Sequence, residues 1–514
     1  MDVVLTMPAR TLQEKIEWVL RSASRMVLAT SVGGVSSAAS VSYARLGSDL
    51  VFFTFNPCRT AEQIRVNPNV QAVIWPRGEH ETCGLQVDAQ CEAIKDPVAQ
   101  HRAYDAILAV TTECKSYMDD EFLNKTGVVG YYRLRPTTIK FIESHSAPHF
   151  QSLEIGHNQC APEWALVRAI AATLKIWIRA IRAPFFTATL IPILLGGTLA
   201  YKQLQAAALA GEWQWARFEW VLLGALLAHA GANLANDFGD YRSHNDESNQ
   251  VPSLFNGGSR VIQAGLLPAW KVLAASVVCF AACIAIGLRL NTVLHGAPFA
   301  VTPLLIIGVA GCVLGAAYTL GPFRLGYRGW GEVAVALGFG PVMLMGAHYV
   351  MTAGLPGQWL WLPPLLASLP VAIFVAAIIW INQFPDVPAD SRSGKKNWVV
   401  RSVREADGVF WYERPWRWFC GLLSIGFGLI VGLGLLGIYV PALSSPFVWL
   451  ALLPVPIAFL AIRWGRDWLA QWNADGADHK RLTYTMLRIN AATILIHAAT
   501  GLLLIGGYAI WVGA

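Results

Sequence analysis

One acidic stretch, which follows directly on the apolar run 218–235, reads Asn233-Leu-Ala-Asn236-Asp237-Phe-Gly-Asp240-Tyr-Arg-Ser-His-Asn-Asp246. The apolar run is long enough for a helix that crosses a membrane. Asn233, Asn236, Asp237 and Asp240 are spaced i, i+3, i+4 and i+7, so they lie on one face of that helix. Carboxylates at membrane depth are costly and usually serve a function. The stretch therefore predicts a functional site at the end of a membrane helix.

A second acidic stretch also ends an apolar run, and it reads Asn382-Gln-Phe-Pro-Asp386-Val-Pro-Ala-Asp390. Its Asn and Asp residues are spaced i, i+4 and i+8, again one face of a helix. Mg²⁺ is bound by a few carboxylates together with substrate phosphates. Two acidic clusters facing one cavity would hold two ions, and the ions would hold a diphosphate. The expected metal ligands are Asp237, Asp240 and Asp246 at one ion and Asp386 and Asp390 at the other.

Each acidic stretch is followed by a basic segment that contains glycine: Gly257-Gly-Ser-Arg260 and Arg392-Ser-Gly-Lys395-Lys396. Such cations would neutralise a departing diphosphate. We expect catalysis to use Asp237, Asp240, Asp386, Asp390, Arg260 and Lys395. Heterolysis of an allylic diphosphate leaves a cation that aromatic rings stabilise; the candidates are Tyr318, Tyr327, Trp330 and Phe384. An ion relay in a transporter, or plain charged loops, is the alternative interpretation of the acidic clusters.

The composition indicates that most of the chain lies in lipid. Of 514 residues, 55% are hydrophobic and only 14% are charged, whereas a soluble domain carries about 25% charged residues. We predict nine membrane spans, at about 184–201, 217–235, 270–289, 300–320, 331–353, 360–382, 417–438, 446–463 and 489–512. Basic residues gather in alternate loops, which places those loops, both acidic stretches and the N-terminus in the cytoplasm. The net charge of +6 then marks cytoplasmic loops rather than nucleic-acid binding.

The nine cysteines form no CxxC pair, so neither a zinc site nor a disulfide framework is expected. Cys279 and Cys283 lie inside an apolar run and are expected to be packing residues. The first 25 residues contain Arg10, Glu14, Lys15 and Glu17 and no apolar core, which excludes a secretory signal. We therefore expect the N-terminal domain to stay in the cytosol.

Residues 1–145 read as a separate soluble domain. Strand-like runs at 26–30, 38–46, 50–55, 70–75, 85–94 and 131–142 are separated by turn residues, and six strands with short turns predict a small antiparallel barrel. Residues 146–182 read as a linker and a basic amphipathic helix suited to the membrane surface. The predicted fold class is thus an α+β split barrel followed by an all-α membrane domain, 183–514, of about nine transmembrane helices.

Three stretches of the N-terminal domain are similar to the pyridoxamine 5′-phosphate oxidase-like split-barrel family: Met26–Thr30, Asp49–Thr54 and Cys58–Val70. The resemblance covers about residues 12–145. It implies FMN as a cofactor, with its phosphate at Arg59 and Thr60 and with Thr54 alongside, and a homodimer formed through the barrel. Thr60 stands where many members have Lys, and the second strand offers only Arg45. A barrel that only dimerises or regulates therefore remains the alternative.

The membrane domain, from about residue 180 to 512, resembles the UbiA superfamily of intramembrane aromatic prenyltransferases. Within it, several stretches look most like 1,4-dihydroxy-2-naphthoate polyprenyltransferases of menaquinone biosynthesis: Asn236–Tyr241, Gly258–Gly265, Tyr318–Pro322, Tyr327–Glu332, Phe339–Pro341 and Asn382–Asp386. The resemblance implies Mg²⁺-dependent transfer of a polyprenyl chain from its diphosphate to a naphthoate ring, with loss of the ring carboxylate. His244 stands where relatives often have a third in-phase Asp.

We expect the two substrates to contact Asn233, Asn236, Tyr318, Arg328, Asn382 and Lys396. Either Arg260 or Arg328 would pair with the ring carboxylate. Three alternatives remain open at the level of sequence: a prenyltransferase with another acceptor such as 4-hydroxybenzoate or homogentisate, an ion-coupled transporter, and a membrane-anchored flavin oxidoreductase.

Overall fold

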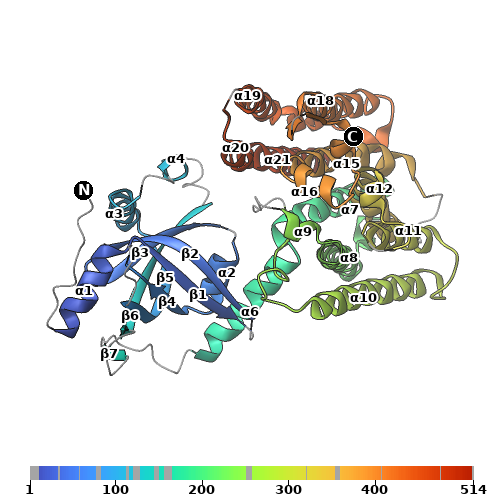
Figure 1. Cartoon of the computed structure of the whole chain (residues 1–514). Coiled ribbons are helices and arrows are strands. Elements are labelled where there is room, and N and C mark those ends of the chain that lie inside the picture. The colour runs from blue at the N-terminus through green and yellow to red at the C-terminus, as the bar shows by residue number, and fades with distance from the viewer. Residues whose placement is uncertain are drawn as a thin grey trace. The chain divides into compact units, whose positions relative to one another are not determined.

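The computed structural model describes residues 11–32, 35–56, 58–76, 83–111, 115–119, 128–143, 150–154, 165–249, 257–319, 321–353, 359–406, 408–474 and 476–511. The chain divides into two compact units (Figure 1): Met1–Ile176 with Gln263–Leu267, and Trp177–Ile262 with Pro268–Ala514. Most of the predicted linker lies outside the described residues.

Six antiparallel strands close a barrel in the first unit. They are β1 (Arg25–Val32), β2 (Val35–Leu46), β3 (Asp49–Phe55), β4 (Asn69–Ile74), β5 (Cys83–Ala93) and β6 (Val129–Glu143). The strand order is β3-β2-β1-β4-β5-β6, and β3 pairs with β6 to close the ring. The predicted barrel and its six strands are confirmed. A seventh strand, β7 (Phe150–Glu154), pairs with the end of β6 and was not predicted.

Alternating side chains of the strands fill the barrel, because successive residues of a strand point to opposite faces. Met26, Leu28, Phe52 and Leu85 are among the fully buried ones. In the described residues, helices accompany the strands: α1 (Leu12–Ser22), α2 (Arg59–Val66), α3 (Pro97–Leu108) and α4 (Lys115–Met118). Thr11 and Glu14 form a reciprocal capping box at the start of α1, which satisfies two backbone N–H groups that a helix leaves free.

Eight helical segments of the second unit, within the described part of the chain, are long and apolar enough to cross a membrane. They contain α7 (Thr187–Ala206), α8 (Trp215–Arg242), α10 (Ala269–His295), α13 (Gly331–Leu337) with α14 (Met343–Thr352), α15 (Leu362–Asn382), α18 (Glu413–Leu436), α19 (Val455–Trp472), and α20 (His479–Thr485) with α21 (Leu487–Ile510). The remaining predicted span, 300–320, is the shorter apolar helix α11 (Pro303–Ala317). It is short because Pro303 begins it and the chain turns after Ala317.

Short elements follow the ends of the long helices and carry the last part of each acidic stretch. These are α9 (Asn245–Ser248) after α8, α12 (Leu325–Arg328) after α11, and α16 (Val387–Arg392) and α17 (Trp398–Ser402) after α15. The hairpin of β8 (Arg404–Ala406) and β9 (Val409–Trp411) leads into α18. A helix, α6 (Ala165–Ala180), precedes α7 where the sequence predicts a basic helix.

The helices α15, α18, α19 and α21 share one large hydrophobic core, in which Phe374, Trp416, Trp468 and Ile496 are buried. Helix α21 approaches the segment Pro446–Leu452 closely. A Cβ atom on Gly507 would lie 2.7 Å from the backbone oxygen of Phe447, whereas a Cβ atom on its neighbour Gly506 would meet nothing. Backbone atoms cannot rotate away, so Gly507 is required by packing.

We predict that Gly507→Ala destabilises the protein by about 1–3 kcal/mol, the usual cost of overpacking a well-filled interior. The measurement is the midpoint of thermal unfolding in detergent. Gly506→Ala is the matched control on the same helix, and it should leave the midpoint unchanged or raise it, because alanine is the better helix former. Equal midpoints for the two variants would contradict this packing.

Candidate active site

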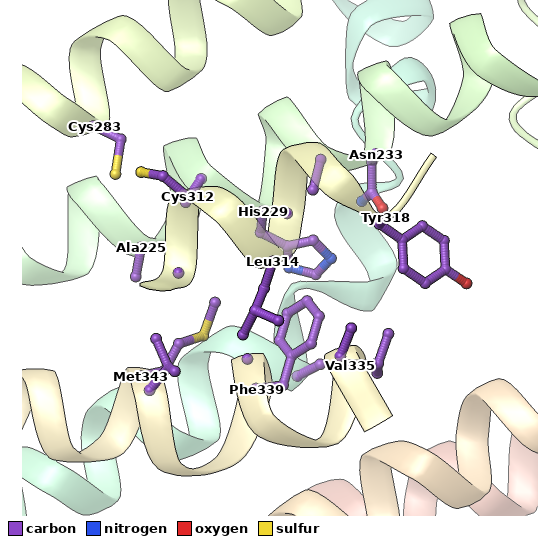
Figure 2. A pocket seen from close by; sticks show the side chains of 18 of the residues that line it. Ala225, His229, Asn233, Cys283, Cys312, Leu314, Tyr318, Val335, Phe339 and Met343 are labelled. Carbon is purple, nitrogen blue, oxygen red and sulfur yellow. The ribbon is translucent and has the colours of Figure 1, made fainter. Parts of the chain in front are cut away.

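A cavity of about 830 Å³ lies in the second unit, with a polar end and an apolar remainder. Its apolar walls come from α8, α10, α11, α13 and α14, and Figure 2 shows Ala225, Leu314, Val335, Phe339 and Met343 among the lining side chains. Its polar end holds the carboxylates of Asp240, Asp246, Asp386 and Asp390, together with Lys395 and Arg182. Both acidic stretches therefore line the same cavity.

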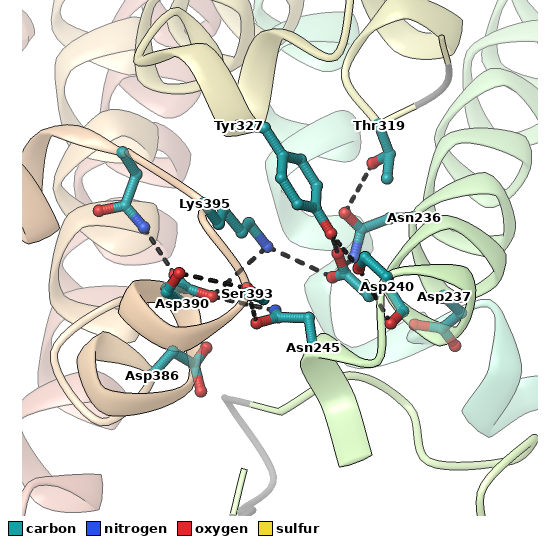
Figure 3. Close-up of polar contacts among 12 residues, drawn as sticks. Asn236, Asp237, Asp240, Asn245, Thr319, Tyr327, Asp386, Asp390, Ser393 and Lys395 are labelled. Atoms are coloured by element: carbon teal, nitrogen blue, oxygen red, sulfur yellow. Dashed lines mark hydrogen bonds and ion pairs between the residues drawn. The ribbon is translucent and has the colours of Figure 1, made fainter. Parts of the chain in front are cut away.

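Asp240, in the last turn of α8, is held by neutral and charged donors (Figure 3). The hydroxyl of Tyr327 donates to Oδ1 at 2.7 Å, and the amide of Asn236 donates to Oδ2 at 3.1 Å. Thr319 in turn donates to Asn236 Oδ1 at 2.8 Å and thereby orients that amide. Spacing i, i+4 on one helix face brings Asn236 to Asp240, as the sequence indicated.

Lys395 lies between the two acidic clusters. Its Nζ is 3.3 Å from Asp240 Oδ2 and 3.9 Å from Asp390 Oδ1. Gly394 adopts φ +73°, a left-handed conformation that ends α16 and reverses the chain. The backbone N–H of Lys395 then donates to the carbonyl of Asp390 at 2.8 Å. The reversal therefore places the Lys395 side chain beside Asp390 of the same segment and Asp240 of α8.

Asp390 is buried and accepts two amide hydrogen bonds. Asn245 Nδ2 donates to its Oδ1 at 3.0 Å, and Asn397 Nδ2 donates to its Oδ2 at 2.6 Å. Ser393 donates to Asn245 Oδ1 at 2.6 Å and fixes the orientation of that amide. Asn245 begins α9 and lies at the end of the first acidic stretch, so this amide joins the first stretch to the second.

Asp237 points to a different set of partners. Arg182 Nη2 donates to its Oδ1 at 2.5 Å, and the backbone N–H of Ser259 donates to the same oxygen at 3.2 Å. Its Oδ2 is buried without a hydrogen-bond partner among the described residues. Asp386 accepts a hydrogen bond from Asn249 Nδ2 at 2.7 Å. The Asp246 carboxylate lies against Gly258, where a Cβ atom would overlap its Oδ2.

Burial and neighbouring charge shift the pKa values of this cluster. Burial raises the pKa of Asp390 to about 7, against the opposing effect of Lys395. Burial also raises the pKa of Asp246 well above its usual value, and the carboxylates of Asp240 and Asp237 add to the rise. Burial disfavours the charge of Lys395, but Asp240 and Asp390 outweigh it, so the pKa of Lys395 is raised. The site is therefore short of positive charge.

The other predicted substrate contacts divide into two groups. Asn233, Asn236, Tyr318 and Asn382 line the cavity; Asn233 donates to the carbonyl of Ile181 at 2.9 Å, and Asn382 accepts from Asn490 at 2.6 Å. Three predicted cations do not line it: Arg328 and Lys396 are exposed, and Arg260 donates to the backbone carbonyl of Asp246. Of the four aromatic candidates only Tyr318 lines the cavity, since Tyr327 binds Asp240, Phe384 packs in the core and Trp330 is exposed.

The sequence reading missed several residues of the site. Asn245, Asn249 and Asn397 hold the carboxylates, and Phe339 with His229 forms an aromatic wall in which the two ring centroids lie 4.6 Å apart. Arg182 was expected at the membrane surface, yet it is paired with Asp237. Asn side chains that donate hydrogen bonds to carboxylates follow no regular spacing in the sequence, so only the folded structure identifies them.

Cys279 packs against Gly231 as predicted, whereas Cys283 lines the cavity.

The donor set suits a hard cation such as Mg²⁺. Within the described ranges, no three His, Cys, Asp or Glu side chains come together as a metal site. Mg²⁺ is nevertheless commonly bound by one or two carboxylates, with the remaining positions filled by water and phosphate oxygens. The carboxylates at the polar end, and the unpartnered Oδ2 of Asp237, are oxygen donors of that kind.

The barrel residues predicted to grip FMN do not assemble a phosphate site. Arg59 is exposed, Thr60 is buried in the barrel unit, and Thr54 Oγ1 is hydrogen-bonded to Cys58 Sγ at 3.3 Å. Both terminal nitrogens of Arg45 are engaged by Glu17, at 2.5 and 3.0 Å. A phosphate needs several cations or backbone donors, and among these predicted residues only Arg59 presents a cation. FMN binding stays a prediction that this geometry does not support.

The comparison with known families agrees with the architecture of the second unit. Residues 189–481, more than half of the chain, match the UbiA prenyltransferase family. The chain belongs to this family. It is therefore an enzyme of the prenyltransferase class, and a role as an ion transporter or a mere membrane anchor is not supported. The eight apolar helical segments likewise fit an integral membrane protein.

Individual relatives of this UbiA-family chain include naphthoate and naphthoquinone prenyltransferases. The chain is 32% identical to a 2-carboxy-1,4-naphthoquinone phytyltransferase of Synechocystis, over 48% of this chain and 78% of the relative. It is 23% identical to a 1,4-dihydroxy-2-naphthoate octaprenyltransferase of Bacillus subtilis, over 60% of this chain and 86% of the relative. Among solved structures, a putative pyridoxamine 5′-phosphate oxidase from Listeria innocua matches 26% of this chain and 98% of its own, at 18% identity and a TM-score of 0.22.

We predict that Tyr327→Phe lowers the rate of prenyl transfer about tenfold, because a hydrogen bond to a charged group contributes about 1.5–3 kcal/mol. The variant removes the hydroxyl that orients Asp240 and leaves the ring in place. The measurement is the initial rate of product formation in membranes at saturating substrates. Tyr349→Phe, which removes a hydroxyl bonded to His295 away from the cavity, should keep the wild-type rate. Equal losses in the two variants would contradict the role of Tyr327.

Proposed function

We propose that this enzyme transfers a polyprenyl chain from its diphosphate to 1,4-dihydroxy-2-naphthoate, with Mg²⁺ and with loss of the ring carboxylate, in menaquinone biosynthesis. The observation that carries the proposal is the division of one cavity into a carboxylate-lined end and a long apolar remainder. A prenyl diphosphate has the same division, with a multiply charged head and a hydrocarbon chain. Burial of the chain in apolar surroundings favours binding by about 0.8 kcal/mol per CH₂ group.

The carboxylates of Asp240, Asp246, Asp386 and Asp390 would hold the metal ions, and Asp237 would join them through its unpartnered oxygen. Bound Mg²⁺ neutralises the diphosphate and makes it a better leaving group. Lys395 is the cavity cation nearest both clusters, so it is placed to contact the diphosphate as well. Arg182 provides a second cation at the same end.

The remaining residues protect the reacting carbon. Loss of diphosphate develops positive charge on the allylic carbon, and water would capture it. The wall of Phe339, Leu314 and Val335 excludes water there, while the aromatic faces of Tyr318 and Phe339 attract the charge. Asn233, Asn236 and Asn382 supply the polar groups between the charged end and the apolar wall, where the hydroxyl groups of a ring acceptor would bind.

The acceptor is inferred from the names of the relatives, which specify naphthoate or carboxynaphthoquinone rings. Neither Arg260 nor Arg328 lines the cavity, whereas Arg182 does. Arg182 is therefore the stronger candidate to pair with the ring carboxylate. The cytoplasmic side is proposed for the polar end and for the N-terminal barrel, because the loops on that side carry the basic residues. A homodimer through the barrel remains a prediction.

We predict that Asp240→Asn and Asp386→Asn each lower transfer at least 100-fold, since each removes a charge that would hold a metal ion (about 2.7 kcal/mol or more of the activation barrier). The assay uses membranes, a polyprenyl diphosphate, 1,4-dihydroxy-2-naphthoate and Mg²⁺, with chromatographic detection of prenylated, decarboxylated product. Removal of Mg²⁺ with a chelator should abolish product in the wild type, and added Mg²⁺ should restore it.

Asp467→Asn is the matched control, since Asp467 is exposed on α19 and does not line the cavity. It should retain wild-type activity. The same assay with 4-hydroxybenzoate and homogentisate tests the acceptor. Product from either of these, with none from the naphthoate, would overturn the proposed acceptor; full activity of both site variants would overturn the proposed metal site.

A further inference from the structure

Two cysteines from neighbouring helices meet in the wall of the substrate cavity. Cys283 lies on α10 and Cys312 on α11, and both line the cavity. Figure 2 shows the two sulfur atoms pointing toward one another. Neither cysteine is fully buried, because each faces the cavity. The pair is thus accessible to a molecule bound there.

The connection between α10 and α11 fixes how these helices face each other. Asn291, which is fully buried, donates to the carbonyl oxygens of Ala297, Pro298 and Ala300 at 2.9–3.3 Å. Thr302, at the start of α11, donates to Asn291 Oδ1 at 2.6 Å. From this pinned turn Cys283 and Cys312 are each about 12–15 Å away along their helices, at 1.5 Å per residue. The pairing of the sulfurs is therefore built into the hairpin.

The acceptor chemistry gives such a pair a use. An allylic cation reacts with an electron-rich ring. The 1,4-dihydroxy form of the acceptor has an electron-rich ring, whereas the ring of the quinone form is electron-poor. A 1,4-naphthoquinone that entered the cavity would have to gain two electrons and two protons before it could be prenylated. Two thiols side by side can supply both.

We propose that Cys283 and Cys312 are a redox-active dithiol that reduces a 1,4-naphthoquinone bound in the cavity. The use of this step for prenyl transfer rests on the proposed function, whereas the reduction itself does not. Both S–H bonds break and one S–S bond forms. The two electrons and two protons convert the two ring carbonyls into hydroxyls, so the dithiol and quinone become a disulfide and a hydroquinone. An external thiol reductant returns the disulfide to the dithiol.

The first test uses the full-length protein in detergent, reduced and freed of reductant, then mixed with 2,3-dimethyl-1,4-naphthoquinone. Both ring positions of this probe are blocked, so thiol addition to the ring is suppressed. We expect a mass loss of about 2 Da, the two hydrogens of a disulfide. We also expect a crosslinked peptide joining Cys283 to Cys312, and one equivalent of hydroquinone. Cys283→Ser and Cys312→Ser should show none of these.

Two controls separate the pair from other thiols. Cys279 lies one turn from Cys283 on the same helix but faces Gly231, and Cys420 lies on α18. The variants Cys279→Ser and Cys420→Ser should both form the Cys283–Cys312 crosslink as the wild type does. A general thiol oxidant serves as the positive control. A crosslink with that oxidant but not with the quinone would overturn the electron transfer. If neither the quinone nor the general oxidant produces a crosslink, the pairing of the thiols is overturned.

A second measurement connects the dithiol to prenyl transfer. Without added reductant, the pre-reduced wild type should prenylate the quinone form of the acceptor for about one turnover, as a stoichiometric dithiol allows. In Cys283→Ser the ratio of the rate with the quinone form to the rate with the dihydroxy form should fall at least tenfold. If no form is prenylated by the wild type, the proposed function fails, while the crosslinking result still decides the dithiol. An unchanged ratio would contradict the proposal.

Discussion

The cation of Lys395, placed between the carboxylates of Asp240 and Asp390, is the interaction on which the site depends. Buried carboxylates repel one another and lose hydration, so they are tolerated only with a nearby cation and hydrogen-bond donors. Lys395 supplies the charge to both stretches at once. Tyr327, Asn245 and Asn397 supply donors. Removal of the cation would leave Asp240 and Asp390 without an ion-pair partner among the described residues.

The two halves of the helical unit use their side chains differently. The helices α15, α18, α19 and α21 pack large aromatic residues into a continuous core, whereas α8, α10, α11 and α14 surround the cavity. The short α11 and the π-helical turn Gly338–Val342, which contains Pro341, occur on the cavity side. Proline removes a backbone donor and interrupts regular helix. This irregular backbone carries Phe339 in the cavity wall.

The sequence revealed those parts of the fold and site that follow a local period. Apolar runs located the membrane helices, alternation located the six barrel strands, and the i, i+3, i+4 spacing located Asn236 and Asp240 on one face. The span count was less accurate because the hydropathy of 300–320 does not reveal that the helix ends at Ala317. Arg328 and Lys396 were predicted as substrate contacts, but both are exposed and neither lines the cavity. Asn245 and the facing thiols depend on contacts between segments that are distant in the sequence, which no local pattern encodes.

The most direct test of the account is the binding of an unreactive prenyl thiolodiphosphate with and without Mg²⁺, measured calorimetrically on the wild type, Asp240→Asn, Asp390→Asn and the double variant. If the two acidic stretches form one diphosphate site, each single change removes the Mg²⁺-dependent gain in affinity, and the double variant is no weaker than either. Two independent losses that add in free energy, or tight binding that needs no Mg²⁺ in the wild type, would contradict a single metal-assisted site.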